Sequence, residues 1–415
     1  MLRLLNSLGG QLEKFRPLEP GKVSMYHCGP TVKEPIHIGK FRSFLVADIL
    51  RRHLEYSGCE VHQVMNITDV GHLNEFEEDA IEIAAARSGL NAWELIEQEE
   101  AKFHEERREL RIRDAHEYPK AREHVETMID FARELEQKGV CYSAGGNLYL
   151  DVSKFRDFGK LSGKPLDELT GLQQSSKTTV SPEKKHPLDI DLWRTDAIHQ
   201  MRWDSPWGRG FPGWHVECAA MSRKYLGGAF DIHTGADDNI FPHHECEIAQ
   251  VEVLTDKPLA RYWLHSGPVT VEGKPMNRKN ANLVTVRELL GSGFRGSVVR
   301  VALLSSHYRT ELDMGESTFD KARAFVDTVL GFHEHLSEAV KASASVSGSA
   351  TTSSPAPWIA ATDTAFCSAF DNDLDYPSAM RAILDTLVRL EPEDVGDPRQ
   401  ALAALEGWDR VMGAL

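Results

Sequence analysis

Four side chains in this sequence are candidate ligands for one metal ion. His243 and Glu247 lie four residues apart in FPHHECE (241–247), a segment whose pattern predicts the start of a helix. Side chains at this spacing share one helix face, so an imidazole and a carboxylate can bind the same ion. Cys218 and Cys28 can each add a thiolate. Two sulfurs, one nitrogen and one oxygen together suit zinc.

Spacing alone leaves this metal site open. Cys218 follows Trp214 closely, and a free cysteine is often an ordinary buried residue packed beside such a ring. His244 and Cys246 lie next to the candidate ligands and compete for the same roles. A zinc-binding structural domain without catalysis would show the same cluster of cysteine and histidine.

A second candidate site is a turn suited to phosphate. In PIHIGK (35–40), Gly39 lets a ligand approach the backbone, and the N–H groups of the helix that follows attract negative charge. His37 and Lys40 can add charge-assisted hydrogen bonds. The alternative is a capped helix that carries a histidine on its surface.

These residues need a sheet to position them. Residues 23–29 read as a strand, apolar residues at helical spacing predict a helix over 38–56, and residues 61–67 read as a second strand. Gly58 ends the helix, and Pro35 helps to keep the chain before it extended. A strand, a helix and a strand at this spacing form a βαβ unit, which indicates a parallel sheet.

The rest of the chain divides by composition. Residues 74–138 have a long, charged helical pattern that Gly139 ends, and a polar, Gly/Ser-rich stretch follows in the 160s and 170s. An aromatic, Gly-rich block occupies 192–250, and residues 259–305 return to a mixed helix and strand pattern. The remaining residues read as helical, interrupted by ASASVSGSATTSSPAP (342–357), which we expect to be a flexible, disordered linker.

Composition limits the classes of function. The 415 residues are 41% hydrophobic and 27% charged, as in a soluble protein with room for two or three domains. Lys and Arg total 47 against 63 Asp and Glu, a net charge of −16, so nucleic-acid binding requires a local basic patch. No apolar run reaches the ~18 residues of a membrane span, and the N-terminus does not read as a secretory signal. The six scattered cysteines indicate reduced thiols, so we expect a cytoplasmic protein without a membrane partner.

Five blocks of sequence together resemble one enzyme family. The blocks are MYHCGPTV…HIGK (25–40), NITDV (66–70), WDSPWGRGFPGWHVEC (203–218), FDIH…FPHHECEIAQ (230–250) and LVTVREL (283–289). In this order they closely resemble cysteinyl-tRNA synthetase, a class I aminoacyl-tRNA synthetase. The likeness runs from about Leu2 to HYR at 307–309, and more loosely to the end.

The resemblance implies the architecture. We expect an α/β fold: a doubly wound, parallel-sheet, Rossmann-like catalytic domain that is split by an insertion and followed by a mainly helical domain. We expect the first half of the catalytic domain at 1–110, the connective insertion at 111–200 and the second half at 201–265. The KMSKS-like loop with the stem-contact region would follow at 266–310, and the helical domain with its linker at 311–415.

The resemblance also implies the chemistry. L-cysteine and ATP, with Mg²⁺, would give cysteinyl-adenylate and pyrophosphate, and the cysteinyl group would pass to tRNA(Cys). One zinc ion per chain would bind the substrate thiol through the positions that match the family's ligands: Cys28, Cys218, His243 and Glu247. Because zinc bonds a thiolate far better than a hydroxyl, such an ion would select cysteine over serine.

Further site positions come from the same resemblance. Trp214 matches the aromatic wall of the cysteine pocket, and the Thr68 hydroxyl matches a group that positions the substrate. His37 matches the first histidine of the HIGH-type signature, which stabilises the α-phosphate during attack by the cysteine carboxylate. The expected nucleotide-binding positions are Gly29, Gly39, Asp238, Lys274 and Lys279.

The sequence departs from the family at three places. Lys40 stands where His or Asn is usual, and Pro275 and Arg278 replace the two lysines of the mobile KMSKS loop. We expect Arg278, helped by Lys40, Lys274 or Lys279, to hold the leaving pyrophosphate; the alternative is a decayed loop with slow or lost activation. The small C-terminal domain that many relatives use at the anticodon is also expected to be missing.

These departures open a second interpretation of the acceptor. The ligase of mycothiol biosynthesis uses the same activation but passes cysteine to the amine of an amino sugar. The blocks around CGPTV and WDSPW are closer to the true synthetases, so we expect tRNA charging. A small-molecule amine acceptor and an inactive zinc- or nucleotide-binding paralogue are the alternatives. A monomer is the family default.

Overall fold

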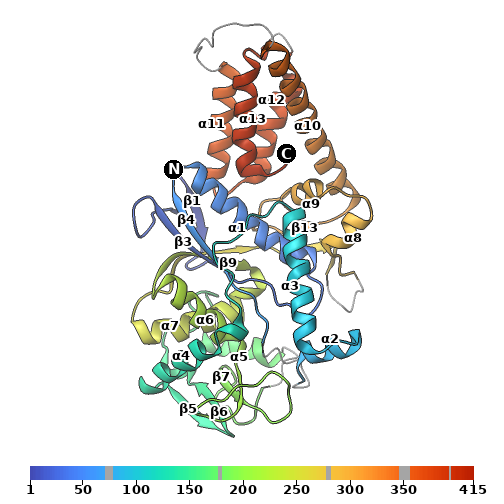
Figure 1. The fold of residues 1–415 in the computed structure, drawn as a ribbon. Coiled ribbons are helices and arrows are strands. Elements are labelled where there is room, and N and C mark those ends of the chain that lie inside the picture. The colour runs from blue at the N-terminus through green and yellow to red at the C-terminus, as the bar shows by residue number, and fades with distance from the viewer. Residues whose placement is uncertain (71–77, 176–179, 277–281, 345–355, 392–393) are drawn as a thin grey trace.

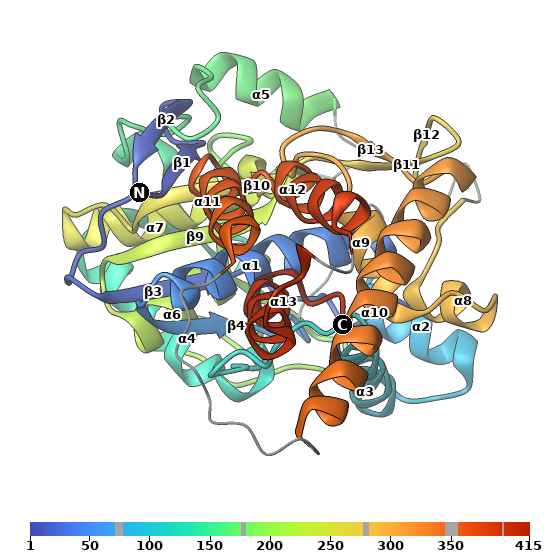
Figure 2. The same cartoon turned by 90° about the horizontal axis from the view of Figure 1, so that it is seen from above.

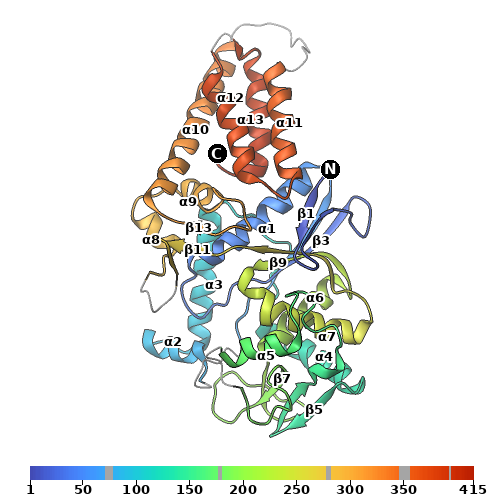
Figure 3. The ribbon, with the colours of Figure 1, turned by 180° about the vertical axis from the view of Figure 1, so that it is seen from behind.

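The structure is a computed structural model. It describes residues 1–70, 78–175, 180–276, 282–344, 356–391 and 394–415. A bundle formed by α10 (Glu316–Ala344), α11 (Pro357–Asp371), α12 (Tyr376–Arg389) and α13 (Pro398–Met412) stands at one end of the molecule (Figures 1 and 3). The insertion around β5 (Cys141–Ala144) lies at the other end, and a parallel sheet lies between them.

The central sheet has the strand order β10-β9-β3-β4, and all its pairings are parallel. The strands are β3 (Lys22–His27), β4 (Glu60–Met65), β9 (Phe230–Ala236) and β10 (Ala260–Ser266). The chain leaves β3 on one side to reach β4 and later returns on the other side with β9. The strand order therefore reverses between β3 and β9, and ligands of doubly wound sheets bind at the carboxyl ends of the strands at such a point.

Helix α1 (Ile38–Tyr56) connects β3 to β4. The βαβ prediction is confirmed: the helix has the expected bounds, and both strands lie within about two residues of the expected ones. The helix is buried along most of its length because the sheet covers one side and the bundle covers its C-terminal half. Viewed from the bundle end, α13 lies close to α1 (Figure 2).

The sheet separates two apolar cores. Met25 and Ile232 point to the core shared with α1 and the bundle, whereas Tyr26 and Trp263 point to the core shared with the insertion. This alternation follows from the two-residue period of a strand. Helix α6 (Trp214–Leu226) covers the second face, so the sheet places α1 and α6 on opposite sides of the crevice.

The other elements complete these layers. The remaining strands are β1 (Arg3–Asn6), β2 (Gln11–Lys14), β6 (Asn147–Leu150), β7 (Ile190–Thr195), β8 (Gly210–Pro212), β11 (Val269–Val271), β12 (Lys274–Pro275) and β13 (Leu312–Asp313). The remaining helices are α2 (Ala80–Ser88), α3 (Ala92–Glu109), α4 (Val125–Gln137), α5 (Leu166–Ser175), α7 (Glu245–Thr255), α8 (Val286–Gly291) and α9 (Gly296–Leu303). Short turns are η1 (Ala121–Glu123), η2 (Val152–Lys154), η3 (Asp237–Asn239) and the π-helical η4 (Ile240–His244).

The structure bears on the expected absence of a membrane span but does not test the expected linker. Within the described residues, no helix is long and apolar enough to cross a membrane. The expected linker, 342–357, falls largely on 345–355, which lies outside the described residues, so its disorder stays a prediction. The domain boundaries also stay predictions.

A buried charge cluster joins α1 to the C-terminal part of the chain. The carboxylate of Asp48 accepts hydrogen bonds from Arg52 and Arg300, in each case at 2.7 Å, and all three side chains are buried. Arg300 also donates to the carbonyl of Met412 near the end of α13. Although burial opposes its ionisation, the two guanidinium groups hold the pKa of Asp48 below its usual range.

We expect Asp48→Asn to destabilise the fold strongly. The change leaves two buried guanidinium groups without their counter-charge, which costs about 3–5 kcal/mol. Denaturant unfolding of the whole chain measures the loss. The matched control is Asp130→Asn, whose ion pair with Arg133 is exposed and is worth at most about 1 kcal/mol. Equal losses for the two variants would contradict the assignment.

Candidate functional site

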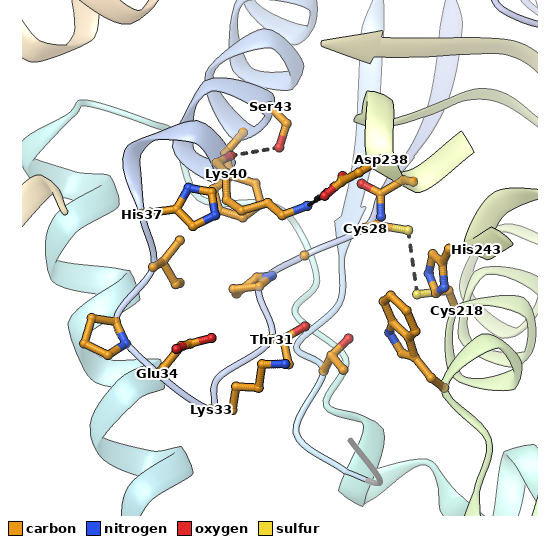
Figure 4. Close-up of a pocket in the computed structure, with 18 of the residues that line it drawn as sticks. Cys28, Thr31, Lys33, Glu34, His37, Lys40, Ser43, Cys218, Asp238 and His243 are labelled. Carbon is orange, nitrogen blue, oxygen red and sulfur yellow. Dashed lines mark hydrogen bonds and ion pairs between the residues drawn. The ribbon is translucent and has the colours of Figure 1, made fainter. Parts of the chain in front are cut away.

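A cavity of about 290 Å³ opens at the carboxyl ends of β3 and β9, where the strand order reverses. Figure 4 shows its two ends. Cys28, Cys218 and His243 lie together at one end, and His37, Lys40 and Asp238 lie near the N-terminus of α1. The sheet thus places the candidate metal ligands and the phosphate-facing turn in one crevice.

The four predicted metal ligands converge in the structure. Cys28 follows β3, Cys218 lies in α6, His243 in η4 and Glu247 in α7, and one donor atom of each lies within 4.8 Å of the others. The two sulfurs are 3.8 Å apart, and Sγ of Cys28 lies 3.5 Å from Oε1 of Glu247. Oε1 of Glu247 also lies 3.1 Å from Nε2 of His243. All four side chains are buried.

These separations match a tetrahedral metal shell. Zinc bonds of about 2.3 Å to sulfur and about 2.0 Å to nitrogen or oxygen place neighbouring ligand atoms about 3.3–3.8 Å apart. The three separations above fall within or close to that range, although the donors come from four different elements. The donor set therefore fits a single divalent cation with a preference for sulfur and nitrogen.

Two further histidines lie beside the same cluster. Nε2 of His233, in β9, lies 2.9 Å from Oε2 of Glu247, and Nε2 of His244 lies 3.2 Å from Sγ of Cys28. With Cys28 and Glu247 they form an alternative set of possible ligands. The sequence pattern marks His244 as a competing ligand but does not mark His233. The signal was a histidine on a strand buried along its whole length.

Burial sets the ionisation of the cluster. Burial lowers the pKa of His243 to about 3, so its ring is neutral and can bind a metal. Burial, with the neighbouring Cys218, raises the pKa of Cys28 well above its usual range, and burial also raises that of Cys218. Burial opposes ionisation of Glu247 too, but its interactions with His233 and His243, including a hydrogen bond with His233, hold its pKa below its usual range. A cation at this place would stabilise both thiolates.

An aromatic wall supports His243. The ring of Trp214 stacks on that of His243, with centroids 4.7 Å apart and an angle of 25°. Nδ1 of His243 lies 2.9 Å from Nδ1 of His215, which leaves Nε2 to face Glu247. Trp214 also lines the cavity, as expected for a wall of the pocket.

Thr68 also lines the cavity and is fixed by its neighbours. Its hydroxyl accepts a hydrogen bond from the side-chain amide of Asn66 at 3.0 Å, and the other end of that amide accepts from the backbone N–H of Gly29 at 2.9 Å. A Cβ at Gly29 would lie 1.6 Å from the carbonyl oxygen of Asn66. Glycine is thus required there by the close approach of two backbone segments.

The expected phosphate-facing turn lies at the start of α1. His37 is the N-cap of α1, and its Nδ1 is buried without a hydrogen-bond partner among the described residues. Burial, then the charge of Lys40, lowers the pKa of His37, so the ring is neutral at neutral pH. Nζ of Lys40 lies 2.8 Å from each carboxylate oxygen of Asp238, across the cavity (Figure 4). A Cβ at Gly39 would lie 3.0 Å from both His37 and Met276.

The expected activation loop is described only in part. Lys274 and Pro275 form β12, which pairs with β11 and is exposed. Arg278 and Lys279 lie outside the described residues. The chain returns with residues 282–285, and its backbone bonds to the start of α1.

Comparison with known proteins gives a consistent result. The family model for the class I (C) tRNA synthetase catalytic domain matches residues 14–324. A cysteine–tRNA ligase of Carboxydothermus hydrogenoformans is 42% identical over 337 residues, which cover 81% of this chain and 70% of that protein. A cysteine–tRNA ligase of Heliobacterium modesticaldum is 38% identical over 444 residues. The match covers 100% of this chain and 88% of that protein.

Solved structures share the fold. Mycobacterium tuberculosis methionyl-tRNA synthetase in complex with methionyl-adenylate superimposes with a TM-score of 0.63 at 14% identity. The match covers 94% of this chain and 90% of that one. A putative arginyl-tRNA synthetase of Campylobacter jejuni gives a TM-score of 0.56 at 13% identity, with 96% and 94% coverage. The expected doubly wound catalytic fold is therefore confirmed.

Proposed function

Because this chain belongs to the cysteinyl-tRNA synthetase family of class I, we propose that it activates L-cysteine with ATP and transfers the cysteinyl group to tRNA(Cys). The observation that carries the proposal is a single crevice with two chemically different ends. One end holds thiol, imidazole and carboxylate donors within 4.8 Å of one another, and the other carries the N-terminus of α1 with His37 and Lys40. A thiol-bearing amino acid and a nucleoside triphosphate meet there.

The metal end would select the amino acid. In our proposal Cys28, Cys218, His243 and Glu247 hold one zinc ion, whose chemistry here is a direct bond to the substrate's thiolate. Trp214 packs on His243 and closes one side of the pocket. Thr68, fixed by Asn66, also lines the cavity and would present its hydroxyl to the substrate. Such a pocket rejects serine, which offers a poor ligand in place of the thiolate.

The other end would bind ATP, which arrives with Mg²⁺. The N-terminal N–H groups of α1 and the ammonium of Lys40 would attract the phosphates. His37 would donate a hydrogen bond to the α-phosphate as the carboxylate of cysteine attacks it. Asp238 holds Lys40 in place across the cavity. The protein's contribution is positioning and charge stabilisation.

The acceptor in our proposal is tRNA, since the relatives that match most of this chain are cysteine–tRNA ligases. This similarity favours neither a small-amine acceptor nor an inactive paralogue. We also propose that the protein acts as a monomer in the cytoplasm, as the resemblance implies.

A paired assay tests the proposal. Purified zinc-loaded protein is followed for cysteine-dependent ATP–pyrophosphate exchange in one tube, and for labelled cysteine on tRNA(Cys) in the other. Exchange together with charging is the expected result. Exchange without charging would show an activating ligase with a different acceptor, and no exchange would show that the altered loop has lost the chemistry.

We expect Arg278→Ala to slow activation. Its position in the sequence matches the second lysine of the KMSKS motif, and a cation there would stabilise the leaving pyrophosphate. The exchange rate should fall about 100-fold, as for loss of one charge-stabilising group. Lys257→Ala, at an exposed position before β10, is the control. Full-rate exchange by the Arg278 variant would remove this residue from the mechanism.

A further inference from the structure

Arg42 is a fully buried arginine on α1 that the mechanism above does not use. Burial lowers the pKa of its guanidinium group to about 10, which leaves it charged at neutral pH. Its two terminal nitrogens donate to five oxygens: those of Gly267 at 3.0 Å, Pro268 at 3.2 Å, Thr310 at 2.7 Å and His307 at 3.0 Å, and the hydroxyl of Ser306 at 2.8 Å. Such a concentration of carbonyl groups on one guanidinium fixes the backbone around it.

The five acceptors come from two segments that frame a small sheet. Gly267 and Pro268 lead directly into β11, and residues 306–310 lead into β13. The two segments also bond to each other, from Gly267 N–H to Tyr308 at 2.7 Å and from Leu312 N–H to Pro268 at 3.0 Å. The strand β11 pairs with both β12 and β13. Because Arg42 binds the backbone just before β11, it fixes the position at which the β11–β12 hairpin begins.

The start of α1 also holds the chain that returns after this hairpin. The N–H of Ile38 donates to the carbonyl of Val284 at 2.8 Å, and His37 and Thr285 form an antiparallel bridge. Met276, at the end of the hairpin, lies against Gly39. The start of α1 therefore presents His37 to the cavity, contacts Met276 at the end of the hairpin and bonds to the backbone that returns after it.

We propose that Arg42 is a positioning residue for the activation step: it fixes the β11–β12 hairpin, with Lys274, relative to His37 and Lys40. This inference rests on the proposed function, because it concerns ATP held by that turn. The guanidinium is planar and presents donors in a fixed fork, which a lysine ammonium cannot reproduce. A hairpin displaced by about 1 Å costs catalysis up to about 100-fold, since its groups miss the transition state.

The test compares Arg42→Lys with Arg51→Lys. Arg51 is buried on the same helix, but its guanidinium bonds to Glu55, Gln63 and Asp114, away from the hairpin. We expect Arg42→Lys to lower kcat for cysteine-dependent exchange about tenfold or more, with zinc content and the KM for cysteine unchanged. Arg51→Lys should change kcat less than about twofold, because its bonds lie outside the site.

A second readout separates positioning from general damage. By hydrogen exchange, the amides of Leu312, in β13, and of Met314, which follows it, should lose protection in Arg42→Lys while those of β3 and β9 keep it. Unchanged kcat would overturn the proposal, and so would a loss of protection throughout the sheet or a matching loss of zinc. If Arg42→Lys does not fold, Ser306→Ala removes one acceptor and should give a smaller loss of the same kind.

These outcomes are distinct from failure of the proposed function. If the wild-type protein shows no cysteine-dependent exchange, the proposed function is wrong, and the kinetic part of the inference falls with it. The comparison of amide protection still decides whether Arg42 holds the hairpin. If the wild type is active and Arg42→Lys behaves like Arg51→Lys, only the inference is wrong.

Discussion

Cys218→Ser should abolish cysteine activation while the fold remains intact. Ser keeps the size of the side chain but replaces a thiolate ligand by a hydroxyl, which zinc binds poorly. Replacement of groups that merely orient a ligand costs metal affinity about 10–100-fold, so loss of a ligand should cost at least about 100-fold. Cysteine-dependent exchange should fall at least as far. Metal analysis after dialysis, exchange kinetics and thermal unfolding together measure the effect.

Cys246→Ser is the matched control. Cys246 is buried next to Glu247 in α7, but it belongs to neither group of candidate metal ligands. The variant should keep its zinc and most of its exchange activity, with at most a modest loss of stability. Unchanged zinc content in Cys218→Ser would break the ligand assignment. A shared loss in both variants would indicate damage to the core rather than to the site.

The βαβ unit was predictable because its signals are local. Apolar periodicity after Ile38 and the glycine at 58 define α1, and both features act within a few residues of where they occur. What surrounds the helix was not predictable in this way. Asp48 and Arg42 are charged residues of this helix, yet both are buried because distant segments cover them. Arg300, the partner of Asp48, and residues 267–268 and 306–310, which bind Arg42, are brought there only by the tertiary fold.

The candidate site was predictable to different degrees. Only His243 and Glu247 follow from spacing, because they share one turn of backbone. Cys28 and Cys218 meet them because β3 ends at the point where the sheet reverses and α6 crosses the same edge. No local pattern encodes that meeting, so the set of four rested on the family resemblance. His233 was missed for the same reason, since its contact with Glu247 joins β9 to α7.

His37→Ala should slow activation far more than it weakens ATP binding. The buried Nδ1 of His37 has no partner among the described residues, and the neutral ring at the N-terminus of α1 lines the nucleotide end of the cavity. In our proposal its hydrogen bond forms mainly with the charge that develops on the α-phosphate. Loss of one such donor costs about 100- to 1,000-fold in kcat, whereas the KM for ATP should change less than about fivefold.

Two further variants decide whether the hydrogen bond is the cause. His37→Gln retains an amide donor and should recover part of the rate, which a role in packing alone would not require. His62→Ala removes an exposed imidazole from β4 outside this cavity and should leave exchange unchanged. A rise in the KM for ATP with full kcat in His37→Ala would mean that the ring binds the ground state and the transition state equally. His37 would then be a binding residue, and the charge stabilisation would come from the N-terminus of α1 and Lys40.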